Sequence, residues 1–356
     1  MAQVTMEEMM RRHMIAAKYF AEERHKAAQM FNDALYYDLD KLAELARMGR
    51  EIVPAEEEIP MPSDEILKKK VEVFRALRLE ILAEKKKDAP EKIWLWPEGV
   101  LPQLTEYTEN PGLRYTHDPD FIPYMYPVLV PENITPKGAL ILCAGGDHGE
   151  PVFRSVDVAS NFVKKGYQCF LLLNRTNHNP WSGEEAGVDA ARAIRIIRAD
   201  AEKYRIDPAK IAFAGFSNGG LTGEKAIEFY SGNQTVQSVF PDYTPDEMDG
   251  ISADMAAFLC IYGPRFANAP FKWDGVVYPP TFFAVGRLDS AMVNFEYVYP
   301  DLLAHNVPVE VHTFAVTPHG MAGCRRMDGC VKYPNFELWE ELADYFLMDV
   351  FKGYTE

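Results

Sequence analysis

The pentapeptide Gly215 to Gly219 reads Gly-Phe-Ser-Asn-Gly and lies between an apolar run and the start of a candidate helix. The run Ile211 to Phe216 alternates large and small apolar residues, as expected for a buried parallel strand. Glycines on both sides of Ser217 permit a sharp strand-to-helix turn that exposes the serine hydroxyl. The pattern therefore predicts an α/β fold and makes Ser217 a candidate nucleophile.

Because such a pentapeptide also occurs by chance, its context decides its meaning. The apolar run Pro280 to Val285 leads to Asp289, and the run Val309 to Val316 leads to His319. Carboxyl ends of parallel strands share one rim, so these side chains can converge on Ser217. Taken singly, the serine and the aspartate could cap helices and the histidine could lie in an ordinary loop. Their order, Ser-Asp-His, is that of the α/β-hydrolase arrangement and favours a catalytic triad.

The three residue types suit nucleophilic catalysis. A serine hydroxyl becomes reactive when an imidazole accepts its proton, and a buried carboxylate orients that imidazole. His319 would be the base and Asp289 its partner. The oxyanion of the intermediate needs hydrogen-bond donors. The backbone N–H of Asn218 is one candidate, and the loop Ala144 to Gly149, which reads Ala-Gly-Gly-Asp-His-Gly after an apolar run, is the other.

Several further motifs accompany the pentapeptide. They are Ile-Trp-Leu-Trp-Pro at 93–97, the glycine loop after Cys143, Ala-Arg-Ala-Ile-Arg and Ile-Asp-Pro between Asp189 and Ser217, and Thr-Pro-His-Gly at 317–320. Over about residues 92 to 352, the chain resembles the α/β-hydrolase carbohydrate esterases. It is similar in particular to acetyl esterases and acetylxylan esterases, and more loosely to feruloyl esterase relatives.

This resemblance implies hydrolysis of a short acyl ester on a sugar or a similar alcohol. It also supports the triad and gives roles to the residues around it. The implied catalytic and oxyanion residues are Ser217, Asp289, His319, Asn218, Gly145, Gly146 and, through its backbone N–H, Asp147.

The oxyanion loop departs from the family pattern of a proline, three glycines and an aromatic residue. This chain has Ala144, two glycines, Asp147 and His148. We expect the Asp147 carboxylate to point away from the oxyanion and His148 to contact substrate in the aromatic position. The usual Tyr-Arg pair is also missing from 174–181, where we expect Trp181 to border a wide alcohol side. Our hypothesis is a small acyl pocket and a substrate other than plain xylan.

Composition excludes some functions. The 356 residues carry a formal net charge of -16, which argues against nucleic acid or an anionic membrane as a partner. No window approaches the roughly 18 apolar residues of a membrane span. Charged residues interrupt Met1 to Arg24, so a signal peptide is not indicated and we expect a cytoplasmic protein.

Metal and disulfide chemistry are not expected. We predict no metal and no cofactor, although Asp147, His148 and Glu150 could hold an ion. The five cysteines are interpreted mainly as buried free thiols. Cys324 and Cys330 could alternatively form a local bridge.

The chain divides into two predicted parts. Residues 1–90 have amphipathic helical periodicity and form an N-terminal helical extension, whereas 91–356 form the catalytic domain, a doubly wound, mostly parallel sheet. The extension could pack on its own chain, cover the site as a lid, or form a homo-oligomer interface. Seven strands are expected in the catalytic part: 124–130, 139–142, 168–173, 211–216, 257–262, 281–285 and 309–314. Helices are expected at 183–204, 219–230 and 336–352.

The sequence thus predicts a serine carboxylesterase that forms an acyl-enzyme with a small-molecule or oligosaccharide ester. Two alternatives stay open: a serine peptidase or amidase of the same fold, and a catalytically silent binding protein. Acyl length, the alcohol, and the choice between hydrolysis and acyl transfer depend on pocket shape, which the sequence does not specify.

Overall fold

A computed structural model describes residues 91–107, 121–145, 151–175, 180–267, 269–322 and 333–353, with side chains from 158 onward in the helix that begins at Pro151. The predicted extension, residues 1–90, lies outside the described residues, as do Cys324 and Cys330. The predictions made for these segments therefore stay predictions. Almost all the described residues belong to one compact unit.

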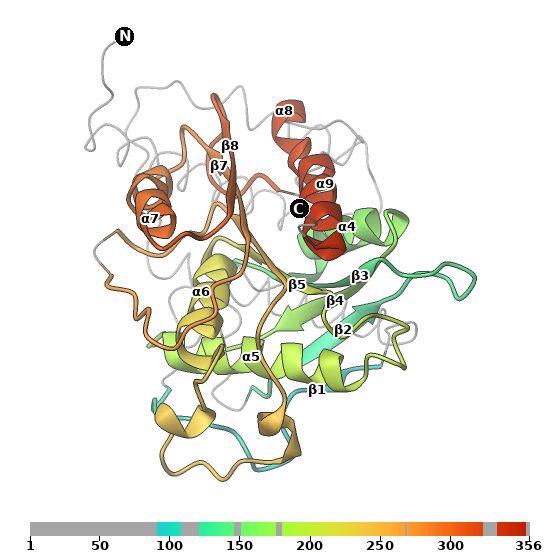
Figure 1. Cartoon of the computed structure of the whole chain (residues 1–356), viewed down its shortest axis with the longest axis vertical. Helices are drawn as coiled ribbons and strands as arrows, with labels where there is room; N and C mark the ends of the chain where they lie inside the picture. The colour runs from blue at the N-terminus through green and yellow to red at the C-terminus, as the bar shows by residue number, and fades with distance from the viewer. Residues whose placement is uncertain are drawn as a thin grey trace, which may run out of the picture. The chain divides into compact units, whose positions relative to one another are not determined.

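One sheet of eight strands organises this unit (Figure 1). Its strands in chain order are β1 (Ile93–Trp94), β2 (Tyr124–Val128), β3 (Gly138–Cys143), β4 (Tyr167–Leu173), β5 (Ile211–Phe216), β6 (Ala257–Ile261), β7 (Thr281–Gly286) and β8 (Val309–Phe314). Their order across the sheet is β1-β2-β4-β3-β5-β6-β7-β8. β1 and β2 are antiparallel to their neighbours, and all the other pairs are parallel. The predicted mostly parallel sheet is confirmed.

The helices connect these strands. They are α4 (Pro151–Lys164), α5 (Gly183–Ala199), α6 (Asn218–Tyr230), α7 (Met292–Ala304), α8 (Pro334–Glu337) and α9 (Trp339–Lys352), with short 3-10 turns η1 (Val236–Ser238) and η2 (Glu247–Gly250). From β3 the chain moves one way through α4 to β4, and then returns through α5 to β5 and onward. Because such crossovers are right-handed, α4 lies on one face of the sheet and α5, α6 and α7 on the other.

The chain adds β4 on one side of β3 and β5 on the other, so the strand order reverses between the adjacent parallel strands β3 and β5. Ligand sites of open α/β sheets lie at the carboxyl ends of strands beside such a switch point. Gly145 follows β3 and Ser217 follows β5, so both lie at this switch point. The topology alone therefore predicts the region of the candidate site.

The core consists of the central strands. Every residue of β3, β5, β6 and β7 is buried, because helices cover both faces. This explains why those strands read as continuous apolar runs. All seven predicted strands are present with ends within two residues of the prediction, while β1 was not predicted as a strand. The helix predicted to reach Tyr204 ends at Ala199, where Asp200 caps it, and the last predicted helix is interrupted at Leu338.

A buried ionic cluster ties the segment 95–107 to α5. Arg175 is fully buried and donates from Nε and Nη2 to the two carboxylate oxygens of Asp189, at 2.9 and 2.8 Å. Asp189 also accepts the indole N–H of Trp96 at 2.9 Å. Glu185 accepts the backbone N–H groups of Leu104 and Thr105, both at 2.7 Å. These hydrogen bonds hold the segment 95–107, which has almost no regular secondary structure, against α5.

Three described cysteines, Cys143, Cys169 and Cys260, are buried and free. Burial raises the pKa of the Cys169 and Cys260 thiols well above the ordinary value. The prediction of buried free thiols is confirmed for these three. Within the part of the chain that the structure describes, no helix has the length and apolarity of a membrane span.

Candidate active site

Ser217, His319 and Asp289 meet at the carboxyl rim of the sheet. The Oγ atom of Ser217 lies 2.7 Å from Nε2 of His319. The Nδ1 atom of His319 lies 2.9 Å from each carboxylate oxygen of Asp289. The three residues follow the ends of β5, β8 and β7, respectively. The convergence predicted from their order in the sequence is therefore present.

Ser217 occupies a strained turn between β5 and α6. Its backbone angles are φ 54° and ψ -120°, and its side chain makes no capping hydrogen bond to the helix. A non-glycine residue in a sparsely populated region costs about 1–3 kcal/mol, which its surroundings must offset. The backbone N–H of Ser217 donates to the carbonyl of Ile261 at 3.0 Å, and this bond helps to hold the turn. Ser217 is thus the N-cap residue of α6 by position, but its hydroxyl bonds to His319 and does not cap the helix.

Glycines are required around this turn because backbones approach each other closely. A Cβ atom on Gly215 would overlap the carbonyl of Gly219, and one on Gly219 would overlap the carbonyl of Cys143. A Cβ on Gly263 would overlap the carbonyl of Ser217 itself. No side chain fits at these positions without moving the backbone. The glycines on both sides of Ser217 are therefore required by the close packing of the backbone at this turn.

Asp289 is fully buried and has two kinds of partner. Besides His319, its Oδ1 accepts the backbone N–H of Ala291 at 2.7 Å. The backbone N–H of Leu288 donates to the carbonyl of Thr317 at 3.2 Å, which joins the loop after β7 to the loop that carries the histidine. Asp289 therefore both stabilises the turn before α7 and holds the imidazole of His319 by a hydrogen bond.

His319 connects the hydroxyl to the carboxylate. Its side chain is 30% exposed, so a substrate could reach it. We assign the Nδ1 proton to the bond with Asp289, because a buried carboxylate accepts and the other nitrogen then accepts from the serine. In this tautomer Nε2 can take the Ser217 proton. The arrangement is that of a general base beside a nucleophile.

The oxyanion residues are only partly described. Asn218 is the first residue of α6, so its backbone N–H follows the serine directly. A Cβ atom on Gly145 would lie 2.7 Å from Cβ and 3.3 Å from Oγ of Ser217, which places the Gly145 backbone against the nucleophile. Gly146, Asp147 and His148 lie outside the described residues, and so does Glu150. Their predicted roles stay predictions.

Trp181 lies just before Ser182, whose hydroxyl caps α5 by accepting the N–H of Glu185. The Trp181 side chain is half-buried, and its buried indole N–H has no hydrogen-bond partner among the described residues. Its contact with the alcohol side of a substrate stays a prediction. No group of three potential metal ligands of the His, Cys, Asp and Glu types occurs in the described ranges.

Tyr262 is a residue at the site that the sequence analysis did not single out. It follows β6, between the strands of the serine and the aspartate, and its ring centroid lies 5.0 Å from that of His319. The sequence contained a signal, because Tyr262 ends a predicted strand and is followed by Gly263. Ser217 likewise stands at a strand end, with Gly219 two residues later. Tyr262 was not selected from the sequence because an aromatic residue at a strand end is usually part of the core.

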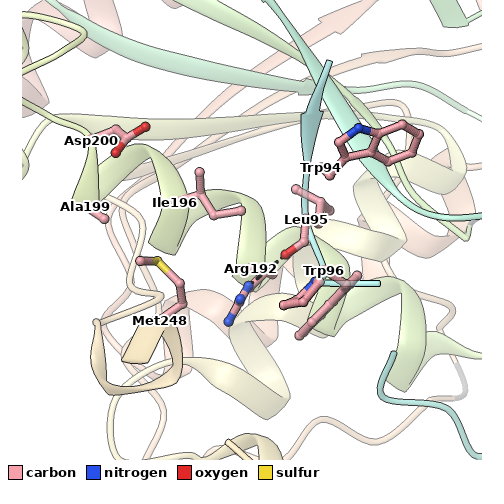
Figure 2. Close-up of a pocket in the computed structure, with 9 residues that line it drawn as sticks. Trp94, Leu95, Trp96, Arg192, Ile196, Ala199, Asp200 and Met248 are labelled. Atoms are coloured by element: carbon pink, nitrogen blue, oxygen red, sulfur yellow. Dashed lines mark hydrogen bonds between the residues drawn. The ribbon is translucent and has the colours of Figure 1, made fainter. Parts of the chain in front are cut away.

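A cavity of about 360 Å³ lies elsewhere in the unit (Figure 2). It is lined by Trp94, Leu95, Trp96, Pro97, Arg192, Ile196, Ala199, Asp200 and Met248. Asp200 follows the last turn of α5, at the edge of the sheet where β5 begins, whereas Ser217 follows the end of β5. The Arg192 guanidinium is already bonded to the Leu95 carbonyl, at 2.9 Å, and to Asp246. The cavity is therefore separate from the triad.

No protein-family model matches the sequence, and no curated protein matches it. Solved structures do match. An acetyl ester-xyloside bifunctional hydrolase from Caldicellulosiruptor lactoaceticus is 21% identical over 73% of this chain and 96% of its own, with a TM-score of 0.53. Est2, a thermophilic esterase from the Planctomycetes species Thermogutta terrifontis with butyrate bound, is 20% identical over 67% of this chain and 93% of its own, with a TM-score of 0.51.

The esterase 2 of Thermogutta terrifontis has also been solved phosphorylated by paraoxon. That structure is 19% identical over 66% of this chain and 90% of its own, with a TM-score of 0.50. At these identities the likeness is one of fold. Together with the strand order and the turn at Ser217, it shows that the described part of the chain has the α/β-hydrolase fold.

Proposed function

We propose that this α/β-hydrolase-fold protein is a serine carboxylesterase that removes a short acyl group from a carbohydrate or a similar alcohol. One observation carries the proposal. The Ser217 hydroxyl lies 2.7 Å from Nε2 of His319, and Nδ1 of the same ring is held by the fully buried carboxylate of Asp289. Such an arrangement makes the serine oxygen a nucleophile at neutral pH.

The proposed reaction has two halves. In the first, Ser217 Oγ bonds to the ester carbonyl carbon while Nε2 of His319 takes the hydroxyl proton. The intermediate then collapses, the imidazolium returns the proton to the departing alcohol, and an acyl-serine ester is left. In the second half, water loses a proton to His319 and attacks this ester, which releases the carboxylic acid and restores the serine hydroxyl. Asp289 stays ionised and stabilises the imidazolium.

The oxyanion of both intermediates requires preorganised donors. The backbone N–H of Asn218 is suited to this role by its place at the start of α6, where the helix dipole also favours negative charge. The second donor would come from the loop that begins at Gly145, whose backbone lies against Ser217. Gly146 and Asp147 would supply it through their backbone groups, and no metal or cofactor takes part in the proposed steps.

The substrate class is supported by two observations. The motifs around 93–97 and 189–217 resemble those of acetyl esterases and acetylxylan esterases. Proteins of similar fold include an acetyl ester-xyloside hydrolase and an esterase solved with butyrate. The altered oxyanion loop, with Asp147 and His148, leads us to expect a substrate other than plain xylan. His148 and Trp181 would contact it on the alcohol side.

Labelling with a fluorophosphonate probe tests the nucleophile. We expect stoichiometric capture at Ser217 in the wild-type chain and none in Ser217→Ala. Ser238→Ala removes an exposed serine hydroxyl of the 3-10 turn η1, outside the triad, and should leave labelling unchanged. An unlabelled wild-type protein would instead identify a catalytically silent binding protein.

A substrate panel then separates esterase from peptidase or amidase. It would compare p-nitrophenyl esters of increasing acyl length, peptide p-nitroanilides, acetylated xylan oligomers and other acetylated sugars. We expect the highest kcat/KM with two- to four-carbon acyl groups and no significant peptide cleavage. Faster cleavage of peptides would contradict the esterase proposal, and acetylated xylan as the best substrate would contradict the proposed sugar preference.

A further inference from the structure

Tyr262 has an unusual backbone conformation beside the triad. Its φ is +42°, although it is a bulky aromatic residue and its side chain is only 4% exposed. The non-glycine residues of positive φ in the described ranges are Arg205, Ser217, Tyr262 and Asn306. Two of these four therefore lie at the candidate active site. Such conformations persist only where the surrounding structure holds them, and they cluster at functional sites.

The backbone around Tyr262 explains what holds this conformation. Its N–H donates to the carbonyl of Ala284 in β7 at 2.9 Å, which continues the ladder between β6 and β7. The next residue, Gly263, passes so close to the Ser217 carbonyl that no Cβ atom would fit. The chain must therefore turn sharply at Tyr262 to bring Gly263 under the serine turn, and the positive φ provides that turn.

The ring of Tyr262 lies in an aromatic cluster that includes the imidazole. Its centroid is 5.0 Å from that of His319, with the two planes inclined by 65°. It also contacts Phe336 at 6.0 Å and Phe216 at 6.3 Å, and both are buried. All three distances fall within the range of favourable aromatic pairs. The tyrosine ring thus connects the catalytic histidine to the rigid core behind it.

Two hydrogen bonds constrain the tilt of an imidazole only loosely, because a hydrogen bond weakens steeply only when its angle falls below about 120°. The ring of His319 is held at Nδ1 by Asp289 and at Nε2 by Ser217. It can still tilt about the line that joins the two nitrogens. Because the N–H bond and the lone pair diverge from that line, tilting misaligns both hydrogen bonds. A ring packed edge-to-face against the imidazole resists this tilt.

We propose that Tyr262 is a positioning residue for His319: its ring fixes the tilt of the imidazole, and its strained backbone places the ring there. The inference rests on the proposed function, since it gives His319 the role of general base. It goes beyond that function because it gives a role to the residue that follows β6, a strand between β5 and β7 that carries no member of the triad.

The rate of Ser217 phosphonylation by a fluorophosphonate probe tests the proposal without requiring the natural substrate. In this step Ser217 Oγ bonds to phosphorus, fluoride leaves, and His319 takes the hydroxyl proton. The second-order rate constant would be measured on the full chain for wild type, Tyr262→Phe, Tyr262→Leu and Tyr262→Asn. Asparagine tolerates a positive φ, so it removes the ring without adding backbone strain and serves if the leucine variant fails to fold.

Phe258→Leu is the matched control, because Phe258 is a buried aromatic residue of β6, the strand that Tyr262 follows, and its ring contacts Phe213. We expect Tyr262→Leu and Tyr262→Asn to slow labelling about tenfold, the rate equivalent of one aromatic contact. Tyr262→Phe keeps the ring and should stay within about twofold of wild type, as should the Phe258→Leu control even where its melting temperature falls.

The outcomes separate this inference from the proposed function. Wild-type chain that takes no label would overturn both. A labelled wild type with equally reactive Tyr262→Leu and Tyr262→Asn variants would overturn the positioning role alone. The same conclusion would follow if Tyr262→Phe lost as much rate as the leucine variant, since the hydroxyl and not the ring would then matter.

Discussion

Replacing Arg175 by methionine should destabilise the catalytic unit more than any ordinary surface change. Arg175 is fully buried between two fully buried carboxylates, Asp189 and Glu185. Its guanidinium makes two hydrogen bonds to Asp189, at 2.8 and 2.9 Å, and one to the Pro102 carbonyl at 2.7 Å. Methionine fills similar space but offers no donor, so the carboxylates are left without a countercharge.

The magnitude follows from the burial of this cluster. Removing one partner of a buried ion pair costs about 3–5 kcal/mol. For a domain of this size, each kcal/mol lowers the melting temperature by about 2–4 °C, so the expected fall is about 6–20 °C. The deficit in the free energy of unfolding should be larger at pH 8 than at pH 5. Burial already raises the pKa of the Glu185 carboxyl, and a carboxyl with a raised folded-state pKa loses stabilisation as pH increases through that pKa.

The assay is thermal and urea unfolding followed by circular dichroism at both pH values. Arg287→Met is the matched control, because Arg287 pairs with Glu296 at 3.0 Å on the surface, with both side chains about half exposed. An exposed pair contributes at most about 1 kcal/mol. Adding Asp189→Asn to Arg175→Met should recover part of the loss, since one buried charge is then removed. The reasoning is refuted if Arg175→Met costs no more than Arg287→Met.

Three further predictions concern the site and its surroundings. Asp289→Asn should lower kcat for p-nitrophenyl acetate by about 10⁴, because an amide favours the wrong imidazole tautomer, while the melting temperature changes little; activity within tenfold of wild type would argue against the triad. Gly263→Ala should abolish fluorophosphonate labelling of Ser217, since a Cβ atom there overlaps the serine carbonyl, whereas Gly250→Ala, which meets nothing within 4 Å, should label normally. A hydrogen bond from its arginine partner lowers the pKa of Asp246 below the ordinary 3.8, so this carboxylate stabilises the fold above that pH and loses the contribution as pH falls through its folded-state pKa. The difference in unfolding free energy between wild type and Asp246→Asn should therefore shrink between pH 5 and about pH 2.5, and a constant difference would contradict it.

Much of the fold could be predicted because buried parallel strands have a local signature. β5, β6 and β7 are buried along their whole length and almost entirely apolar, since helices cover both of their faces, and glycine or polar residues mark most of their ends. β1 has two residues and no such signature, because it is itself the edge strand and pairs only with β2, in the antiparallel sense. The end of α5 was overestimated for a related reason: residues 200–205 have helical composition but form turns.

The candidate site divides in the same way. Ser217, Asp289 and His319 could be found from their order and from the strand ends before them, because a parallel sheet brings all its carboxyl ends to one rim. Tyr262 also stands at a predicted strand end, but that position does not indicate that its ring contacts an imidazole 57 positions away. In the sequence, Asp289 could be either a helix cap or a member of the triad. In the structure it bonds both to the backbone N–H of Ala291, before α7, and to His319.

The amino-acid sequence by itself determined the class of fold, the order in which strand ends precede the serine, the aspartate and the histidine, and the glycines that the serine turn requires. These depend on burial patterns and backbone preferences that adjacent residues carry. Only the tertiary structure decided the orientation of the imidazole, the strained turn at Tyr262 and the burial of Arg175 between two carboxylates. Each of these depends on how segments distant along the chain pack together, and packing distances have no counterpart in local sequence.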